Sequence, residues 1–212
     1  VLTLTGAAST FAEFVLDVGS KSLLLSLVLT MAVCLVLGMG IPTIPNYIIT
    51  SSIAAPALLK LGVPLIVSHM FVFYFGIMAD LTPPVALAAF AAAPIARESG
   101  LKIGLQAVRI AIAGFIVPYM AVYSPALMLQ GGDWLATAWV VFKALVAIGM
   151  WGAGAIGFLL GPLNWLERCV AIGSASFLVV AGPLTDEIGL AAVTLFLVWH
   201  VWRKRQRAAQ PA

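Results

Sequence analysis

Long apolar segments, separated by short polar or glycine- and proline-containing turns, run along almost the whole chain. Two of these segments are interrupted in the middle: residues 23–59 by the run from Gly38 to Asn46, and residues 64–95 by the run from Asp80 to Pro84. Non-helical backbone at membrane depth is tolerated only where protein buries it or where it lines a wet cavity. Paired broken helices of this kind indicate a substrate or ion site of a secondary transporter.

The pattern predicts an all-α, polytopic membrane protein. Residues 22–60 are expected to form a re-entrant helical hairpin, because each arm is short for a full crossing. Two ordinary short spans would leave the same sidedness. Residues 64–95 are expected to cross once with an unwound centre. Four further apolar segments follow at about 105–129, 134–160, 165–182 and 187–202, of which the last two are near the lower length limit for a span.

These segments divide the chain into three expected parts. Residues 1–20 are a connector or the end of a preceding span, and Glu13 and Asp17 would share a face if they lie on a helix. Residues 21–129 form a transport repeat of hairpin, broken helix and one span. Residues 130–212 add further transmembrane helices and a basic tail. Val1 is not an initiator methionine, so we expect this to be the C-terminal part of a longer polypeptide.

Composition and charge support a membrane setting and suggest an orientation. The chain is 63% hydrophobic and 9% charged. A soluble domain of this length could not bury so much apolar surface. Arg97, Lys102 and Arg109 place the loop after the broken helix in the cytoplasm, and the tail at residues 203–207 returns to the same side four crossings later. The hairpin then enters from outside. Basic residues beside a span are a topology signal, so we expect no nucleic-acid partner.

Charged and aromatic residues in the C-terminal half have simple expected roles. Lys143 lies inside a span near one end, and we expect it to snorkel toward headgroups or to contact a neighbouring subunit. The tryptophans near span ends are expected to be interfacial anchors. His69 and His200 are expected to have no special role.

The first interruption carries the elements of a cation site. Gly38 and Gly40 allow backbone conformations closed to other residues, and the prolines at 42 and 45 leave carbonyl groups without helical partners. Thr43, Asn46 and the hydroxyls at 50–52 add side-chain oxygens. Neutral oxygen ligands suit a weakly held, hard monovalent cation such as sodium. The alternative is a proline-kinked helix that packs against a neighbour.

The second interruption adds complementary helix ends. Pro83 and Pro84 break the helix and free carbonyl groups around residues 77–81, while Thr82 supplies a hydroxyl. The half-helix that begins near Val85 would point its positive N-terminal end toward an anionic group, and the preceding half would offer its negative end to a cation. Asp80 could coordinate the cation, carry a proton or pair with a base outside this chain.

Enzymatic chemistry has no support in the sequence. Asp80 has no evident intramembrane acidic mate, no serine–histidine dyad can be assigned at membrane depth, and no metal cluster, phosphate loop or dinucleotide motif is present. We therefore expect a non-enzyme without a cofactor other than a coupling ion.

Several motifs resemble those of one family, the large membrane subunit of TRAP (tripartite ATP-independent periplasmic) transporters, in the branch where small and large subunits are fused. They are LGMGIPT at 37–43, APAL at 55–58, HMFVFYF at 69–75, LTPPVALAA at 81–89, AGFIVPY at 113–119, SPAL at 124–127, LER at 166–168 and GPLTD at 182–186. Two features depart from the pattern: the proline-rich run Ile44-Pro45-Asn46 and the formal charge of Asp80.

The resemblance implies one repeat of an elevator-type ion transporter in the bacterial inner membrane. It implies uptake of organic acids that a periplasmic binding protein delivers, together with an upstream repeat and a small membrane subunit. The implied sodium site comprises Gly38, Gly40, Thr43, Ala79, Thr82 and Val85, and further substrate or coupling candidates are Asn46, Asp80, Pro83 and Pro84. The alternatives are a proton-coupled carrier that uses Asp80 and a membrane scaffold subunit that transports nothing.

Overall fold

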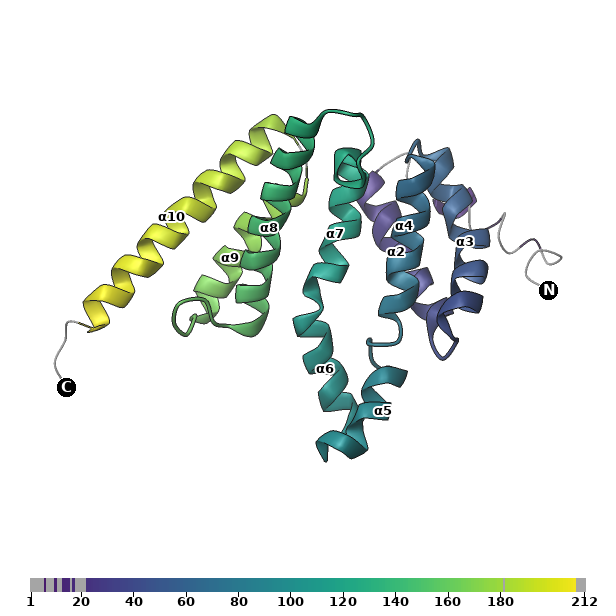
Figure 1. The fold of residues 1–212 in the computed structure, drawn as a ribbon, viewed down its shortest axis with the longest axis horizontal. Coiled ribbons are helices and arrows are strands. Elements are labelled where there is room, and N and C mark those ends of the chain that lie inside the picture. Colours follow the sequence, from purple (N-terminus) through teal and green to yellow (C-terminus); the bar gives the residue numbers. More distant parts are fainter. Residues whose placement is uncertain are drawn as a thin grey trace.

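The computed structural model describes residues 6, 10, 13–15, 17, 22–180 and 182–208, and the described part is helical (Figure 1). Glu13 and Asp17 lie in helical backbone, while most of the expected connector at 1–20 lies outside the described residues. The helices are α2 (Leu23–Gly38), α3 (Thr43–Lys60), α4 (Leu65–Met78), α5 (Leu87–Ala96), α6 (Gly100–Ile110), α7 (Ile112–Tyr123), the 3-10 helix η1 (Pro125–Met128), α8 (Trp134–Ile156), α9 (Trp165–Val179) and α10 (Pro183–Ala208).

The lengths and compositions of these helices confirm the expectation of an all-helical membrane protein. In the described part of the chain, three helical segments are long and apolar enough to cross a membrane: Gly100–Tyr123, Trp134–Ile156 and Leu184–Gln206. The first combines α6 and α7, which meet at Ala111. Shorter apolar helices of 10 to 17 residues include α2, α4 and α5. Such short helices are typical of segments that do not cross a bilayer on their own.

Helices α2 and α3 form an antiparallel pair that packs against α4 (Figure 1). Buried apolar side chains from all three helices make one core, among them Leu27 on α2, Leu58 on α3, and Phe71 and Phe75 on α4. Tyr119 of α7 stacks edge-on against both phenylalanines, with ring centroids 5.3 and 5.7 Å apart. The hairpin, the first half of the broken helix and α7 therefore share a single packed interior.

A second core joins α7 to the three C-terminal helices. Its buried residues are mostly small or flexible, such as Met120, Ala147, Ala171 and Ala175. Small side chains let helix backbones approach closely in a membrane, where no hydrophobic force drives helices together. Arg168 connects α9 to α8 by hydrogen bonds. Its guanidinium donates to the carbonyl groups of Gly154 (2.7 Å) and Ala155 (2.9 Å) at the C-terminal end of α8.

The last helix is longer than expected. The sequence predicts a start at residue 187 after an acidic separator, whereas α10 runs over 26 residues from Pro183. Asp186 lies in its first turn, where a carboxylate is favoured by the exposed N–H groups and the positive end of the helix dipole. The acidic separator is therefore the start of the helix itself.

Our expectation for Lys143 is wrong. The side chain does not reach toward headgroups: Lys143 is only 3% exposed, and its Nζ lies 2.5 Å from Oδ2 of Asp186. A buried lysine without a carboxylate partner would carry a large desolvation cost, which explains why it turns inward to the first turn of α10.

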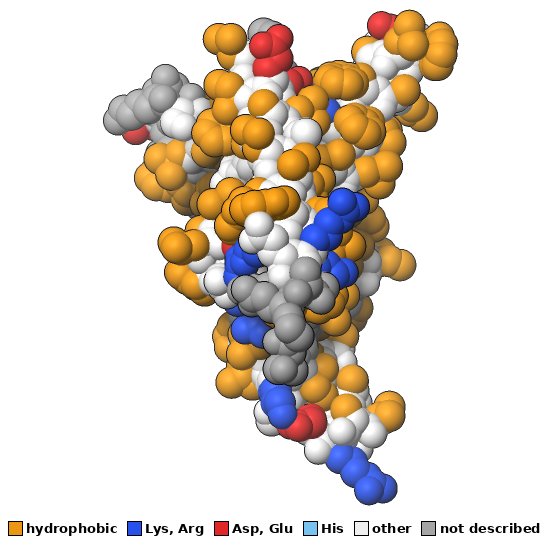
Figure 2. Space-filling model, turned by 90° about the vertical axis from the view of Figure 1, so that its left-hand side faces the viewer, with side chains coloured by type: hydrophobic (Ala, Val, Ile, Leu, Met, Phe, Trp, Pro, Cys, Tyr) orange, Lys and Arg blue, Asp and Glu red, His pale blue; other side chains and the backbone are white. Residues whose placement is uncertain are grey.

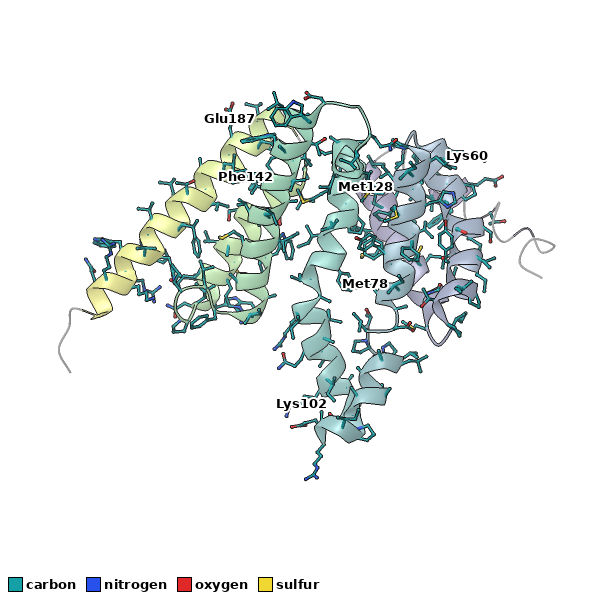
Figure 3. All side chains as sticks on the ribbon, viewed as in Figure 1. Lys60, Met78, Lys102, Met128, Phe142 and Glu187 are labelled. Atoms are coloured by element: carbon teal, nitrogen blue, oxygen red, sulfur yellow. The ribbon has the colours of Figure 1, made fainter. Side chains whose placement is uncertain are left out.

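The ends of the molecule differ in charge as the sequence suggested. Figure 3 shows Glu187 at one end and Lys102 at the opposite end, and in Figure 2 Asp and Glu side chains mark the upper edge whereas most Lys and Arg side chains lie lower. Lys60 lies at the same end as Glu187 (Figure 3). In the loop at the basic end, the hydrogen bond and charge of Lys102, 2.5 Å away, hold the pKa of Glu98 below its usual range.

The connection between η1 and α8 has unusual backbone geometry. Leu129, Gly131 and Gly132 have backbone φ values of 57°, 118° and 73°. Residues other than glycine rarely adopt such positive values. A Cβ atom added at either glycine would meet nothing within 4 Å, so this connection is open rather than packed.

Candidate functional site

The tip of the hairpin is shaped by glycine and proline. Helix α2 ends at Gly38, Gly40 has a φ of 75° that favours glycine, and α3 begins after Pro42. Pro45 lies in the first turn of α3, where backbone N–H groups have no intrahelical partner. The second proline therefore fits the helix start, which accounts for a run that departs from the family pattern.

The tip packs directly on the last turn of α4. A Cβ atom at Gly38 would lie 2.8 Å from the carbonyl oxygen of Gly76, 2.8 Å from Cβ of Ala79 and 2.8 Å from Nδ2 of Asn46. Any larger residue at 38 would therefore push the hairpin away from the broken helix. The two interrupted segments that the sequence singled out are therefore in direct contact here.

Asn46 fastens this contact. Its side chain is 1% exposed and donates from Nδ2 to the carbonyl oxygen of Gly76 at 2.7 Å. Within α3, the hydroxyl of Thr50 donates to the carbonyl oxygen of Asn46 at 2.8 Å. The Oδ1 atom of Asn46 is buried and has no hydrogen-bond partner among the described residues. The structure therefore places Asn46 between the hairpin and α4, with one acceptor still free.

The broken helix is interrupted between Met78 and Leu87. Thr82 folds back, with its hydroxyl donating to the carbonyl oxygen of Met78 at 2.7 Å, and the N–H of Ala88 reaches across the break to the carbonyl oxygen of Asp80 at 3.1 Å. The Pro83–Pro84 peptide is cis. Ala86 takes a left-handed conformation with φ 39°, so α5 begins at Leu87 rather than near Val85.

Of the six predicted sodium-site residues, five lie where the hairpin tip meets the helix break and one, Thr43, is exposed. Gly38 meets Ala79, and a Cβ at Gly40 would lie 4.0 Å from Cγ1 of Val85, so these four residues bring the tip and the break together. Thr82 is half-buried at the same break, whereas Thr43 is exposed at the start of α3.

The remaining candidates have different surroundings. Pro83 packs against α6, with its Cγ 3.1 Å from a Cβ built at Gly104, and Pro84 is exposed. Asp80 is half-buried, and its Oδ1 is buried without a hydrogen-bond partner among the described residues. A carboxylate oxygen in that position is an acceptor available to a cation or a proton.

Helix ends give the site its electrostatic character. The C-terminal end of α4 and the N-terminal end of α5 meet at the break, and the N-terminal end of α3 lies at the tip beside it. Partial negative charge at the first of these ends favours a cation, and partial positive charge at the other two favours an anion. The arrangement suits an ion and an anionic group held close together.

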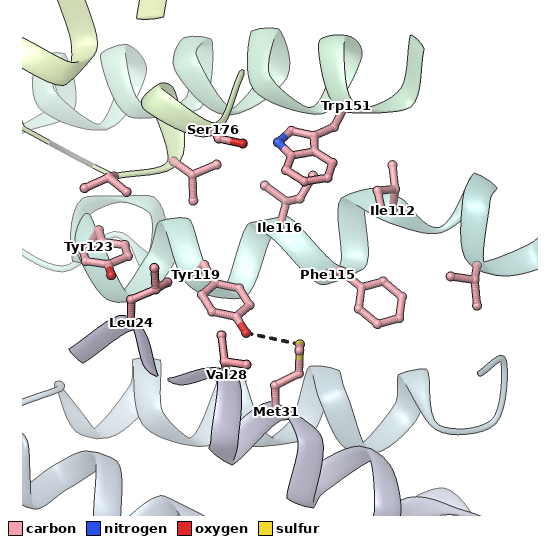
Figure 4. A pocket seen from close by; sticks show the side chains of 13 residues that line it. Leu24, Val28, Met31, Ile112, Phe115, Ile116, Tyr119, Tyr123, Trp151 and Ser176 are labelled. Carbon is pink, nitrogen blue, oxygen red and sulfur yellow. Dashed lines mark hydrogen bonds between the residues drawn. The ribbon is translucent and has the colours of Figure 1, made fainter. Parts of the chain in front are cut away.

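A cavity of about 420 Å³ lies away from this site, between α2, α7, α8 and α9 (Figure 4). Its walls are aliphatic and aromatic, and no charged residue is among the described residues that line it. Tyr119 donates to the sulfur of Met31 at 3.2 Å along one wall. A cavity of this composition suits hydrocarbon rather than a carboxylate.

Two buried ion clusters went unnoticed in the sequence, and both lie in the C-terminal helices. One is the Lys143–Asp186 pair; the other joins Glu167 of α9 to Arg203 of α10, with Nδ1 of His200 3.5 Å from Oε1 of the carboxylate. The available signal was the presence of opposite charges in or beside the C-terminal apolar segments. These pairs fasten helices together and are distant in sequence from the tip and the break.

Fold and site together define a polytopic helical membrane protein in which a hairpin tip packs on a broken helix. The family model described as DctM, the "Tripartite ATP-independent periplasmic transporter, DctM component", matches residues 1–132, more than half of the chain. The chain belongs to this family and is a membrane permease component, as the motifs indicated. No curated protein and no solved structure matches it.

Proposed function

We propose that this chain is part of a sodium-coupled secondary transporter that takes up organic acids across the bacterial inner membrane. The observation that carries the proposal is the packing of the hairpin tip on the broken helix, where Gly38 meets Ala79 and Gly40 faces Val85. Paired interrupted helices with their ends at one place are the usual architecture of a midplane ion and substrate site.

Sodium is the proposed coupling ion because the surroundings offer mostly neutral oxygens, beside the carboxylate of Asp80. Backbone carbonyls at the tip and the break, the hydroxyl of Thr82 and the C-terminal end of α4 are neutral or weakly negative ligands. Carbonyls of unwound backbone and half-helix C-terminal ends are typical ligands of Na⁺ in transporters. In this proposal α2 and α3 form a re-entrant hairpin that opens to the periplasmic side.

The substrate class follows from the opposite helix ends. The N-terminal ends of α3 and α5 both lie at the site, and such ends bind carboxylate groups. An organic acid then sits beside the cation that is transported with it. The name of the family describes a three-part system, and we propose a periplasmic binding protein, a small membrane subunit and an upstream repeat as the partners, with an elevator movement of the hairpin and broken helix.

The test is sodium-driven uptake by the complete transporter in proteoliposomes, supplied with its binding protein. We expect Thr82→Ala to raise the sodium concentration needed for half-maximal uptake about tenfold, because loss of one ligand to a charged group costs on the order of 1.5 kcal/mol. Gly40→Leu should abolish uptake. Thr194→Ala is the matched control, since the hydroxyl of Thr194 makes the same bond to a carbonyl four residues earlier, at 2.7 Å, far from the site.

The same assay separates sodium coupling from a second candidate, proton coupling through Asp80. The unpartnered Oδ1 of Asp80 favours that candidate. If protons drive uptake, Asp80→Asn removes the pH dependence; if sodium does, the pH dependence persists and the sodium affinity changes. Normal sodium-driven uptake in both Thr82→Ala and Gly40→Leu would refute the proposed site.

A further inference from the structure

A second cavity, of about 310 Å³, lies between the loop that follows α8 and the C-terminal end of α10. The loop contributes apolar side chains and the helix contributes basic ones. The lining residues that matter here are Phe158, Leu160 and Pro162 on the loop, and His200, Arg203 and Lys204 on α10. One wall is therefore apolar and the other cationic.

The cationic wall carries uncompensated charge. Arg203 is engaged by Glu167 and lies 5.4 Å from the ring centroid of Trp199. Lys204 and Arg205 are exposed and have no ion-pair partner among the described residues. Figure 2 shows Lys and Arg side chains gathered around this end of the molecule. An anion near the cavity therefore meets unpaired positive charge.

His200 provides an independent sign of a missing partner. It is 4% exposed, stacks on Phe196 with ring centroids 5.9 Å apart, and lines the cavity. Its Nε2 atom is buried without a hydrogen-bond partner among the described residues. Buried polar atoms are nearly always satisfied, and an imidazole Nε2–H can donate to an anionic oxygen.

The position of the cavity relates it to the membrane surface. The apolar run of α10 ends at Trp202 and is followed directly by Arg203, Lys204 and Arg205, so Lys204 lies where this candidate span leaves the hydrocarbon. Trp165 and Trp202 are exposed nearby on α9 and α10, as expected for aromatic side chains at headgroup level. Phe158 is 56% exposed and offers an apolar surface beside the basic groups.

We propose that this cavity binds an anionic phospholipid such as phosphatidylglycerol. Lys204 and His200 hold the phosphate group, and Phe158 and Leu160 contact the upper part of an acyl chain. Basic pockets between transmembrane helices on the cytoplasmic side are suited to anionic headgroups, and the cytoplasmic leaflet supplies them. This inference does not depend on which ion or substrate is transported.

The test is lipid titration of the purified chain in detergent, with bound lipid counted by native mass spectrometry. We expect the wild type to retain one phosphatidylglycerol in preference to phosphatidylcholine. Lys204→Gln should weaken that binding about fivefold, the effect of one basic residue near an anionic surface. Lys102→Gln removes the same charge from another exposed position at the basic end and should leave the affinity unchanged.

Three results would overturn the proposal. Equal retention of phosphatidylglycerol and phosphatidylcholine would show that binding does not depend on the charge of the headgroup. An equal loss in Lys102→Gln would show diffuse attraction rather than a site. Displacement of the lipid by an equal concentration of soluble glycerol 3-phosphate would show a site for free phosphate esters.

Discussion

Gly38 shows how a single missing side chain allows the two interrupted segments to meet. Three heavy atoms lie 2.8 Å from the place where its Cβ would be, and one of them is the backbone oxygen of Gly76. Backbone atoms cannot rotate away as a flexible side chain can. The contact therefore requires glycine for reasons of space, independently of any ion.

We expect Gly38→Ala to separate the hairpin tip from α4 and to destabilise the protein by about 1–3 kcal/mol, the usual cost of overpacking. Thermal unfolding in detergent measures the loss of stability, and sodium-driven uptake measures the effect on the site. Gly149→Ala is the control, because a Cβ at this helical glycine would meet nothing within 4 Å. An unfolding temperature equal to wild type in Gly38→Ala would contradict the packing described here.

For single residues, the sequence predicts where a helix is interrupted but not which other residues each side chain contacts. Glycine and proline at 38–45 and 83–84 mark the tip and the break because their effects are local. The bond from Asn46 to Gly76 spans 30 residues and depends on how the hairpin packs. For that reason Asn46 could be named as a candidate in advance, but its partner could not.

Helix α10 is fastened near both of its ends. Asp186 in the first turn pairs with Lys143 of α8, and Arg203 near the last turn pairs with Glu167 of α9. Lys143 and Glu167 are 3% and 2% exposed. Because such charges are costly to leave alone, each pair strongly favours one register between neighbouring helices.

We expect Lys143→Met to destabilise the helix assembly by up to about 3 kcal/mol, because the carboxylate of Asp186, whose side chain is only 16% exposed, would lose its partner. The double variant Lys143→Met/Asp186→Leu should recover most of that loss, since no buried charge is left. Denaturation of the detergent-solubilised protein, followed by circular dichroism, compares the two. A double variant as unstable as the single one would show that the ion pair is not the cause.

The ends of helices are predictable from the sequence only where the residues at those ends have one usual role. The short arms of the hairpin were predictable from apolar runs bounded by glycine and proline. The start of α10 is not predictable in the same way, because acidic residues such as Asp186 and Glu187 are typical both of a loop and of the first turn of a helix. The role of Lys143 is not predictable from its local sequence, because its partner lies 43 residues away.

At the scale of the whole molecule, the two ends are expected to face opposite sides of the membrane. Lys102 and the C-terminal end of α10 lie at the basic end, whereas Glu187 lies at the other (Figures 1 and 3). An excess of basic residues predicts the cytoplasmic side.

Single cysteines test this orientation in a background where Cys34 and Cys169 are replaced by alanine and serine. We expect Glu187→Cys to react with a membrane-impermeant maleimide in intact spheroplasts, and Arg205→Cys to react only after lysis. Labelling of Arg205→Cys before lysis would reverse the proposed orientation and place the hairpin opening in the cytoplasm.

The open connection of residues 129–133 sets a limit on how far the two parts of the chain can travel past one another. On one side lie the hairpin, the broken helix and α7; on the other lie three helices locked together by buried ion pairs. A Cβ atom built at Gly131 or Gly132 would meet no other atom within 4 Å, so no packed neighbour holds this connection in place. Fully stretched, such a five-residue tether spans about 17 Å, so while η1 and α8 stay folded its two ends cannot separate further.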